Sequence, residues 1–472
     1  MIFSKKKTDT LVQNNTDEDF FRNLRKSDYA YLDEQKQVYL DYTGGNLTPK
    51  KLVEKHHKLL TENILGNPHS TNPTSQRATQ LVEESRKAIL DFFNASDYEC
   101  IFTANASAAL KIVGESYPFN EKSTFILTSD NHNSVNGIRE FCNSKKGVTK
   151  YAPVHYEDLL LDEAKLKELF QESAKGDSNL FAFPAQSNVS GVKHDLSWIE
   201  YAHQQGFDVL LDAAAFVPTS RLDLAKHKPD FVSVSFYKIF GYPTGLGCLL
   251  VKKSSFDKLK KPWFAGGTVS MVSVVEQNKF LSEGHERFED GTLSYNTIPC
   301  IKNGLDYISS IGMEKISKRV SYLIKYLYDE LVKLKHDNGV SIVKIFGPND
   351  FTNRGGNMIV NFFDDDKKLF LYTEIEKIMN KASISIRSGC FCNPGLDEIN
   401  HCIATPEMAK YFSTRDKGDH QDIKNYLGKM RGAVRISVGL ASNAEDLDKF
   451  VQVAKKLKNI KSVDNLSEVF KH

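Results

Sequence analysis

Residues 208–241 read DVLLDAAAFVPTSRLDLAKHKPDFVSVSFYKIFG. The runs Asp208–Leu211 and Phe231–Ser235 in this stretch are short and mostly apolar, which is typical of buried strands. Similar runs occur at Thr124–Thr128, Leu180–Phe183 and Gly247–Val251. Helix-like stretches separate several of them, at Leu81–Phe93, Asp162–Ser173 and Ser197–Gln205. This alternation predicts βαβ units and an α/β fold with a mainly parallel sheet that is buried on both faces.

The pattern changes after Pro299. An amphipathic stretch over Cys300–Leu334 predicts a long helix, and a smaller α+β unit follows it. Its predicted elements are strands at Ser341–Phe346, Asn357–Phe362, Ser383–Arg387 and Ala433–Val438, and helices at Leu369–Lys381 and Ala444–Leu457. We therefore predict a partly flexible N-terminal segment at 1–37, a large domain at 38–299 and a small C-terminal domain at 300–472.

The composition excludes several classes of protein. Lys and Arg number 62 against 60 Asp and Glu among 472 residues, a net charge of +2 that gives no reason to expect nucleic acid or a membrane surface as partner. No apolar run approaches the roughly 20 residues of a membrane span, and the N-terminus does not resemble a secretory signal. Seven cysteines are too few for a disulfide scaffold, so we expect a reducing, cytoplasmic compartment.

Polar side chains follow four of the predicted strands: His132, Asn188, Asp212 and Lys238. Ligands of open α/β sheets bind at the carboxyl ends of the strands, so these side chains are expected to form one site. Asp212 lies between apolar runs and needs a partner, which is either a protonated ring nitrogen of a cofactor or a structural group such as a helix end. Apolar neighbours lower the pKa of a lysine such as Lys238, although a lysine at a strand end can also extend to solvent.

Together, Asp212 and Lys238 are the two groups that pyridoxal phosphate (PLP) chemistry requires, one for the pyridine nitrogen and one for covalent attachment. A phosphate site is also needed, and the small residues of 103–109 lead into a predicted helix whose N-terminus can bind an anion. Ser107 can add its hydroxyl, but an ordinary helix cap explains the same pattern. His132 fits a ring-stacking position and equally a surface loop.

Four longer motifs carry a resemblance to a known family: residues 210–220, LLDAAAFVPTS; 235–247, SFYKIFGYPTGLG; 287–292, RFEDGT; and 387–395, RSGCFCNPG. With them the chain, from about Tyr39 to Asp448, resembles the class V aminotransferase family. These are fold-type I PLP enzymes, and the resemblance points to their cysteine desulfurase group. Within that group the chain is most similar to the N-terminal desulfurase domain of molybdenum cofactor sulfurases.

The resemblance implies that PLP is the cofactor and that its ring and phosphate are held by residues from several strands and loops. Lys238 would attach to the cofactor, Asp212 would pair with the pyridine nitrogen, His132 would stack on the ring and Asn188 would bond its hydroxyl. The implied phosphate ligands are the Ala106 backbone, Ser107, Ser235 and, in the partner subunit of a homodimer, Thr292. Arg435, with Arg387 as a second candidate, would bind the substrate carboxylate.

The chain departs from many relatives at two positions, where Tyr237 precedes the lysine in place of His and Ala215 replaces a Gln. Both departures match the sulfurase subgroup. Sulfurases also carry a C-terminal domain that binds molybdenum cofactor, and we expect none before His472. The sequence therefore leaves open whether molybdenum cofactor receives the sulfur.

Cys390 and Cys392 lie in a loop rich in Gly, Asn and Pro. A metal site with His401 and Cys402 is one alternative, but the spacing differs from the usual zinc pattern, so we predict no metal. A structural role is a second alternative. The favoured interpretation is a nucleophilic thiolate, stabilised by nearby cationic groups such as Arg387. By alignment with the family motif Cys392 is the persulfide cysteine, and Cys390 is an additional candidate.

The predicted reaction removes sulfur from L-cysteine or a similar amino acid, leaves a persulfide on the protein and releases alanine. Another class V PLP enzyme remains possible, namely an aminotransferase, a selenocysteine lyase or a β-lyase. A third alternative is a PLP-binding scaffold that docks a sulfur-acceptor protein. The cysteine loop argues against simple transamination, and retention of Lys238, Asp212 and Arg435 argues against an inactive scaffold.

Overall fold

The structure is a computed structural model that describes residues 15–173, 176, 178–403, 405–428 and 431–461. Its larger unit is built on a seven-stranded sheet. In spatial order the strands are β2 (Tyr98–Thr103), β8 (Gly247–Lys252), β7 (Phe231–Ser235), β6 (Phe207–Asp212), β5 (Asn179–Pro184), β3 (Thr124–Thr128) and β4 (Val148–Ala152). Six of the seven strands run in one direction, and β8, between β2 and β7, runs in the opposite direction. The predicted mainly parallel sheet is therefore confirmed.

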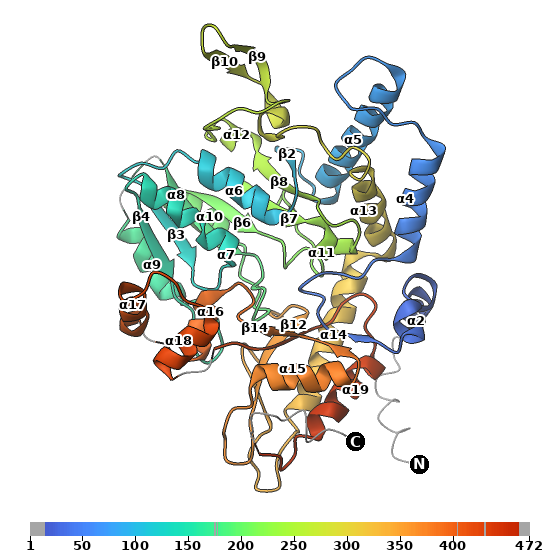
Figure 1. Cartoon of the computed structure of the whole chain (residues 1–472), viewed down its shortest axis with the longest axis vertical. Coiled ribbons are helices and arrows are strands. Elements are labelled where there is room, and N and C mark those ends of the chain that lie inside the picture. The colour runs from blue at the N-terminus through green and yellow to red at the C-terminus, as the bar shows by residue number, and fades with distance from the viewer. Residues whose placement is uncertain (1–14, 174–175, 177, 404, 429–430, 462–472) are drawn as a thin grey trace.

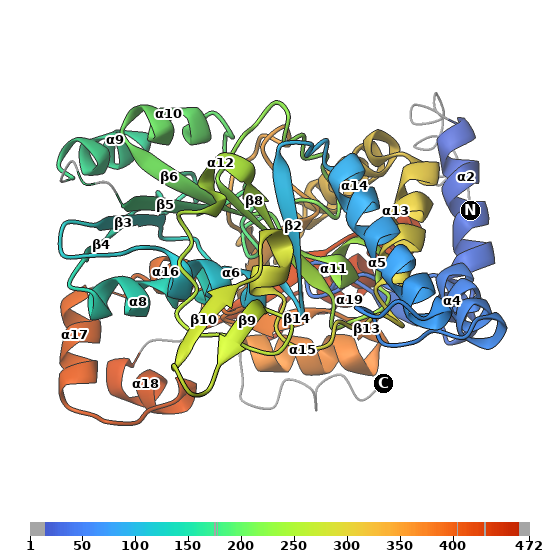
Figure 2. The ribbon, with the colours of Figure 1, turned by 90° about the horizontal axis from the view of Figure 1, so that it is seen from above.

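Helices cover both faces of this sheet, as Figure 2 shows. Alternate residues of one strand point into different cores: Phe181 and Phe183 pack in one, and Leu180 and Ala182 in the other. The first core contains side chains of α5 (Pro73–Phe92), α9 (Glu163–Gln171), α10 (Trp198–Gln204) and α13 (Pro299–Ile311). The second contains those of α6 (Ala106–Ser116), α7 (Asn133–Asn136) and α8 (Ile138–Ser144). Burial on both faces explains why the central strands are almost wholly apolar.

The smaller unit is an antiparallel sheet in the order β11 (Val343–Ile345), β12 (Asn357–Phe362), β15 (Ala433–Ser437) and β14 (Arg387–Gly389). Helices α15 (Tyr372–Lys381) and α19 (Ala444–Lys455) pack with it. Between β14 and β15 the chain forms α16 (Pro394–Asn400), α17 (Thr405–Ser413) and α18 (His420–Leu427). Figure 1 shows this unit below the large sheet.

The helix predicted over Cys300–Leu334 is two helices in the structure. Gly312, with φ +93°, ends α13 and precedes α14 (Met313–Leu331), and glycine adopts this backbone conformation more readily than other residues. Helix α13 packs against α5 and α11 (Phe236–Phe240) of the larger unit, whereas α14 packs against α19. The connection between the units therefore lies within the predicted helix, a little beyond the predicted boundary at 299.

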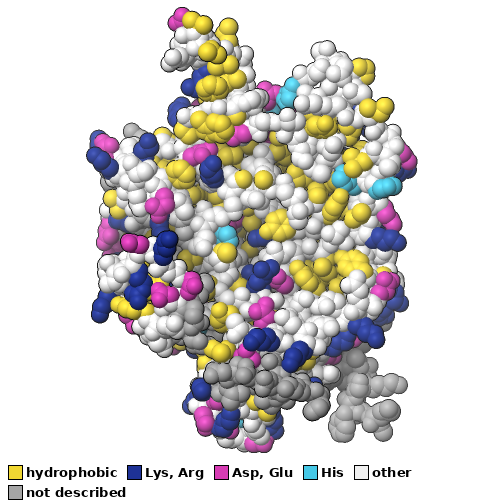
Figure 3. All heavy atoms as spheres, in the orientation of Figure 1, with side chains coloured by type: hydrophobic (Ala, Val, Ile, Leu, Met, Phe, Trp, Pro, Cys, Tyr) yellow, Lys and Arg dark blue, Asp and Glu magenta, His cyan; other side chains and the backbone are white. Residues whose placement is uncertain are grey.

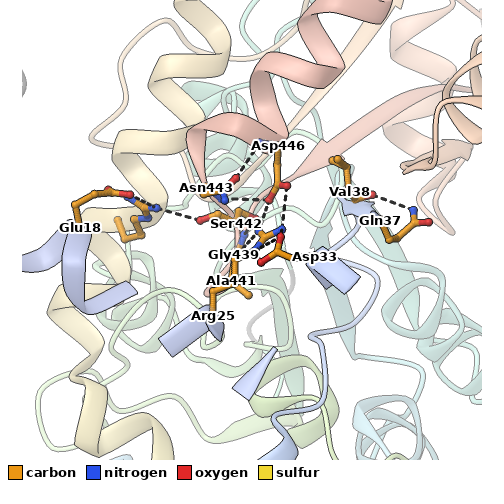
Figure 4. Close-up of polar contacts among 11 residues, drawn as sticks. Glu18, Arg25, Asp33, Gln37, Val38, Gly439, Ala441, Ser442, Asn443 and Asp446 are labelled. Atoms are coloured by element: carbon orange, nitrogen blue, oxygen red, sulfur yellow. Dashed lines mark hydrogen bonds and ion pairs between the residues drawn. The ribbon is translucent and has the colours of Figure 1, made fainter. Parts of the chain in front are cut away.

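The N-terminal segment, where described, packs on the smaller unit. Helix α2 (Asn15–Asp28) is joined to it by ion pairs from Arg25 to Asp446 and from Glu18 to Arg319, and Figure 4 shows these contacts. After α3 (Tyr31–Glu34), strand β1 (Val38–Tyr39) pairs in parallel with β13 (Ile384–Ser385). Residues 15–37 of the segment predicted to be partly flexible are thus largely helical, and residues 1–14 lie outside the described part.

The remaining elements lie at the surface of the larger unit. They are α4 (Lys50–Glu62), α12 (Lys253–Phe256), the hairpin β9 (Val269–Ser273) and β10 (Asn278–Leu281), and the 3-10 helix η2 (Gly284–Phe288). The hairpin projects from the body in Figure 1. Within the described ranges, no helix has the length and apolar character needed to cross a membrane.

Candidate functional site

The carboxyl ends of β3, β5, β6 and β7 meet at one cavity of about 180 Å³. The cavity brings together every predicted cofactor-binding residue except Thr292. The predicted residues that line it are Ala106, Ser107, His132, Asn188, Asp212, Ser235 and Lys238.

Asp212 is buried at the end of β6 with its carboxylate held in place. Its Oδ1 accepts hydrogen bonds from the Ser233 hydroxyl at 3.0 Å and from the Ala214 backbone N–H at 3.1 Å. These contacts come from the neighbouring strand and the following turn, so Asp212 does not cap a helix. A buried, oriented carboxylate at this position fits a protonated pyridine nitrogen.

Lys238 lies in α11, directly after β7. Burial lowers the pKa of its amine, whereas the charge of Asp212 opposes the shift. The charge of Arg435 lowers this pKa further, and that of Cys392 raises it. Lys238 forms no hydrogen bond or ion pair with any described residue, so its amine is available as a nucleophile.

His132 precedes α7, and its Nδ1 accepts a hydrogen bond from the Ser134 backbone N–H at 3.1 Å. Burial lowers the pKa of this imidazole, with the charges of Lys238 and Arg435 acting in the same direction and Asp212 in the opposite one. A neutral imidazole at the cavity wall fits the predicted stacking position.

The N-terminus of α6 forms the expected cradle for an anion. The Ala106 N–H donates to Ser235 Oγ at 2.8 Å, which places that hydroxyl beside the first turn of the helix. The Ser107 and Ser134 hydroxyls lie 2.6 Å apart at the same end. Hydroxyls and a helix N-terminus suit a phosphate group, so the residues present fit PLP.

Thr292 lies elsewhere. It is exposed and lines a separate cavity of about 310 Å³ together with Thr103, Ala108 and Lys111. The structure therefore does not bring Thr292 to the cradle of its own chain.

The cysteine loop is fastened to the larger unit by backbone contacts. The Asn133 N–H donates to the Cys392 carbonyl at 2.7 Å, and the Asn188 side-chain amide donates to the Phe391 carbonyl at 2.8 Å. Phe391 and Cys392 have φ values of +57° and +54°, which are uncommon for residues other than glycine. Asn188 thus bonds the cysteine loop, a contact that the sequence did not reveal.

The two loop thiols differ in environment. Cys392 is exposed, whereas Cys390 is half-buried beside Asp397. Burial, together with the charge of Asp397, raises the pKa of Cys390 to about 12, so its thiol stays protonated at neutral pH. This favours Cys392 as the nucleophile.

No disulfide bond joins cysteines among the described residues. No group of three or more His, Cys, Asp or Glu side chains arranged for a metal ion occurs among the described residues. His401, which was considered for such a site, instead hydrogen-bonds the Gly432 carbonyl at 3.0 Å.

Arg435 is buried on β15 and connects several parts of the site. Its guanidinium donates to Asp41 Oδ1 at 2.8 Å and to the Asn188 carbonyl at 2.9 Å, and it lies over the ring of Phe391. Arg387 pairs with the other oxygen of Asp41 at 2.6 Å. The two predicted substrate arginines therefore share Asp41, a residue that no local sequence signal singled out.

Residues 38–450 match the family described as Aminotransferase class-V, and the chain belongs to this family. Among curated proteins, the molybdenum cofactor sulfurase of Homo sapiens is 36% identical over 91% of this chain and 50% of its own length. That of Bombyx mori is 38% identical over 90% of this chain and 55% of its own length. The chain thus spans about half the length of the curated relatives it matches.

Solved structures agree with this assignment. A cysteine desulfurase from Thermococcus onnurineus NA1 superposes with a TM-score of 0.76 at 26% identity, covering 92% of this chain and 97% of that one. The cysteine desulfurase CsdA from Escherichia coli, at 19% identity, shares the fold with a TM-score of 0.73 over 93% of this chain and 98% of its own. The chain is a fold-type I, PLP-dependent enzyme, and its cofactor is PLP.

Proposed function

We propose that this enzyme is a cysteine desulfurase that transfers the sulfur of L-cysteine to Cys392 as a persulfide and releases alanine. The observation that carries the proposal is the position of the cysteine loop. It is fastened to Asn188, which lines the cavity that holds Lys238 and Asp212, and to Asn133, which follows the cavity residue His132.

PLP, when bound, supplies an electron sink for negative charge that develops on the substrate carbon. Asp212 keeps the pyridine nitrogen protonated, because its oriented carboxylate accepts that proton's hydrogen bond. The Lys238 amine, whose pKa burial lowers, would remove the proton from the substrate Cα. Arg435 orients the substrate through its carboxylate.

Sulfur transfer then depends on Cys392. Its thiolate attacks the substrate sulfur, so that an S–S bond forms and the substrate C–S bond breaks. The electron pair of the broken bond stays with the carbon, which gains a proton to give alanine. The net reaction converts L-cysteine and a protein thiol into alanine and a protein persulfide, and no external oxidant is needed.

Mass spectrometry after incubation of the PLP-loaded protein with L-cysteine tests the proposal. We expect one added sulfur on the peptide that carries the cysteine loop, located at Cys392, and alanine in equal amount during the first turnover. Pyruvate and sulfide formed without sulfur on the protein would point to a β-lyase, and release of alanine from selenocysteine but not from L-cysteine would point to a selenocysteine lyase. Transfer of the amino group to a keto acid would point to an aminotransferase.

We also propose that two copies form the working enzyme, with Thr292 of each chain reaching the phosphate site of the other. Thr292 is exposed, and the projecting hairpin nearby exposes Met271, Val275 and Phe280, at 65%, 90% and 64%. Figure 3 shows apolar side chains on this projection. Clusters of exposed apolar side chains often mark interfaces.

Sedimentation equilibrium tests this assembly. We expect a mass near twice the 53.3 kDa of one chain, and dissociation when Val275 is replaced by Glu. A wild-type protein that sediments as a monomer at micromolar concentration refutes the shared site.

The names of the relatives support a proposal for the destination of the sulfur. Because they are named molybdenum cofactor sulfurases, we propose molybdenum cofactor, or a protein that carries sulfur to it, as the acceptor, with the reaction in the cytoplasm. Sulfur transfer from the labelled persulfide to desulfo cofactor in vitro, together with cell fractionation, tests both parts.

A further inference from the structure

We propose that Asp41 is a positioning residue that occupies Arg435 before the substrate arrives and thereby limits the affinity of the site for amino acids. The inference rests on the proposed function, because it takes Arg435 as the group that binds the substrate carboxylate. Asp41 itself is a carboxylate bonded to this arginine, so it resembles the group that the substrate presents.

The contacts of Arg435 already include one carboxylate, that of Asp41. One terminal nitrogen donates to Asp41 and the other to the Asn188 carbonyl. The Nε is buried and has no hydrogen-bond partner among the described residues. A guanidinium has five N–H groups, of which Asp41 and the Asn188 carbonyl engage two on Arg435. A substrate carboxylate that binds this guanidinium therefore competes with the carboxylate of Asp41 for the same positive charge.

Electrostatics predicts that Asp41, and not the Asn188 carbonyl, gives up its hydrogen bond to Arg435 when the substrate carboxylate binds. Two carboxylates on one guanidinium repel each other, whereas a neutral carbonyl such as that of Asn188 does not oppose the substrate in this way. Arg387 can retain Asp41 when Arg435 turns to the substrate, since its Nε and terminal nitrogen donate to Asp41 Oδ2 at 2.9 and 2.6 Å.

The local backbone keeps Asp41 beside both arginines. Asp41 forms a bridge to Ser437 of β15, and the Thr43 N–H donates to the Ser437 hydroxyl at 3.0 Å. Gly44 makes room for the Asp41–Arg387 pair, because a Cβ at this position would lie 2.5 Å from Asp41 Oδ2 and 2.7 Å from a guanidinium nitrogen of Arg387. The exchange therefore involves side-chain contacts and leaves the chain path in place.

Replacing Asp41 by Asn tests this inference, since the amide keeps the shape and removes the charge. The PLP-loaded protein is titrated with L-alanine, which has the amine and carboxylate of the substrate but no sulfur, and binding is followed by cofactor absorbance. We expect D41N to bind L-alanine about tenfold more tightly than wild type, the size typical of one charged hydrogen bond. Alaninamide, which lacks the carboxylate, should bind both proteins equally.

Asp446→Asn is the matched control. Asp446 is likewise a buried carboxylate paired with an arginine, but its partner is Arg25 of the N-terminal segment and not Arg435 (Figure 4). We expect D446N to lower thermal stability and to leave L-alanine affinity unchanged. Unchanged or weaker L-alanine binding by folded D41N overturns the inference.

Arg387→Gln provides a second test that does not remove a buried group, because the Arg387 side chain is 53% exposed. Without Arg387, Asp41 should hold Arg435 more firmly, so L-alanine should bind several-fold more weakly. The effect should vanish in the D41N background, whereas a direct contact of Arg387 with substrate would persist there and contradict the inference.

These measurements separate the inference from the proposed function. A wild-type protein that binds L-alanine but forms no persulfide from L-cysteine refutes the desulfurase proposal, and the comparison of Asp41 variants still decides the inference. Equal effects of D41N on L-alanine and alaninamide would show a general disturbance of the site and would count against the role of Asp41.

Discussion

Lys238→Ala is expected to abolish covalent PLP binding and the visible absorption band of the loaded enzyme. The Lys238 amine lies at the cavity with Asp212, and no other lysine is among the described residues that line this cavity. Absorbance after dialysis against excess PLP measures the effect. Lys193→Ala is the control, because burial also lowers the pKa of Lys193 but this residue does not line the cavity.

The pH dependence of PLP uptake adds a second criterion. Only the neutral amine attacks the cofactor aldehyde, so the uptake rate should rise with pH and level off above the pKa of Lys238. Since burial lowers this pKa, the inflection should lie below about 10.4, the ordinary value for lysine. An inflection at the ordinary value, or a visible band retained by K238A, contradicts the assignment.

Cys392→Ser should reduce persulfide formation and cysteine-dependent alanine release to the level seen without protein. The serine hydroxyl is not ionised at neutral pH and cannot accept the sulfur as a persulfide. PLP uptake should be unaffected, because the Cys392 side chain is exposed and its loop is held by backbone contacts. Alanine assay, sulfide assay and cofactor absorbance on the same sample measure the three quantities.

Cys390→Ser is the matched control, because Cys390 lies in the same loop, two residues before Cys392. Because the pKa of Cys390 is raised to about 12, this thiol contributes almost no thiolate at neutral pH, and we expect the variant to retain most of its activity. The opposite pattern, with activity lost in C390S and kept in C392S, would move the persulfide to Cys390.

The central strands could be predicted closely from sequence. The predicted strands Thr124–Thr128 and Phe231–Ser235 agree residue for residue with β3 and β7, because burial on both faces leaves short apolar runs with clear ends. Strand β4 was missed because it lies at the edge of the sheet, where Val148 and Tyr151 are exposed and the run is partly polar. The break at Gly312 was missed because an amphipathic pattern continues across it.

The cluster at the cavity could also be predicted, since Asp212 and Lys238 end neighbouring strands of a parallel sheet. Side chains at the carboxyl ends of such strands lie close together irrespective of the conformation of the loops. Their proximity is therefore a direct consequence of local patterns and of one rule of topology.

The contacts of Arg435 depend on the tertiary structure. Asp41 and Arg435 are 394 residues apart, and Asn188 and Phe391 are 203 apart. Such pairs form only when the N-terminal segment, the large sheet and the smaller unit pack together, and neither residue of a pair carries a local signal for the other. Strand and helix periodicity accordingly revealed which residues gather around the cofactor, whereas packing between distant segments decided which groups hold the substrate arginine and the cysteine loop.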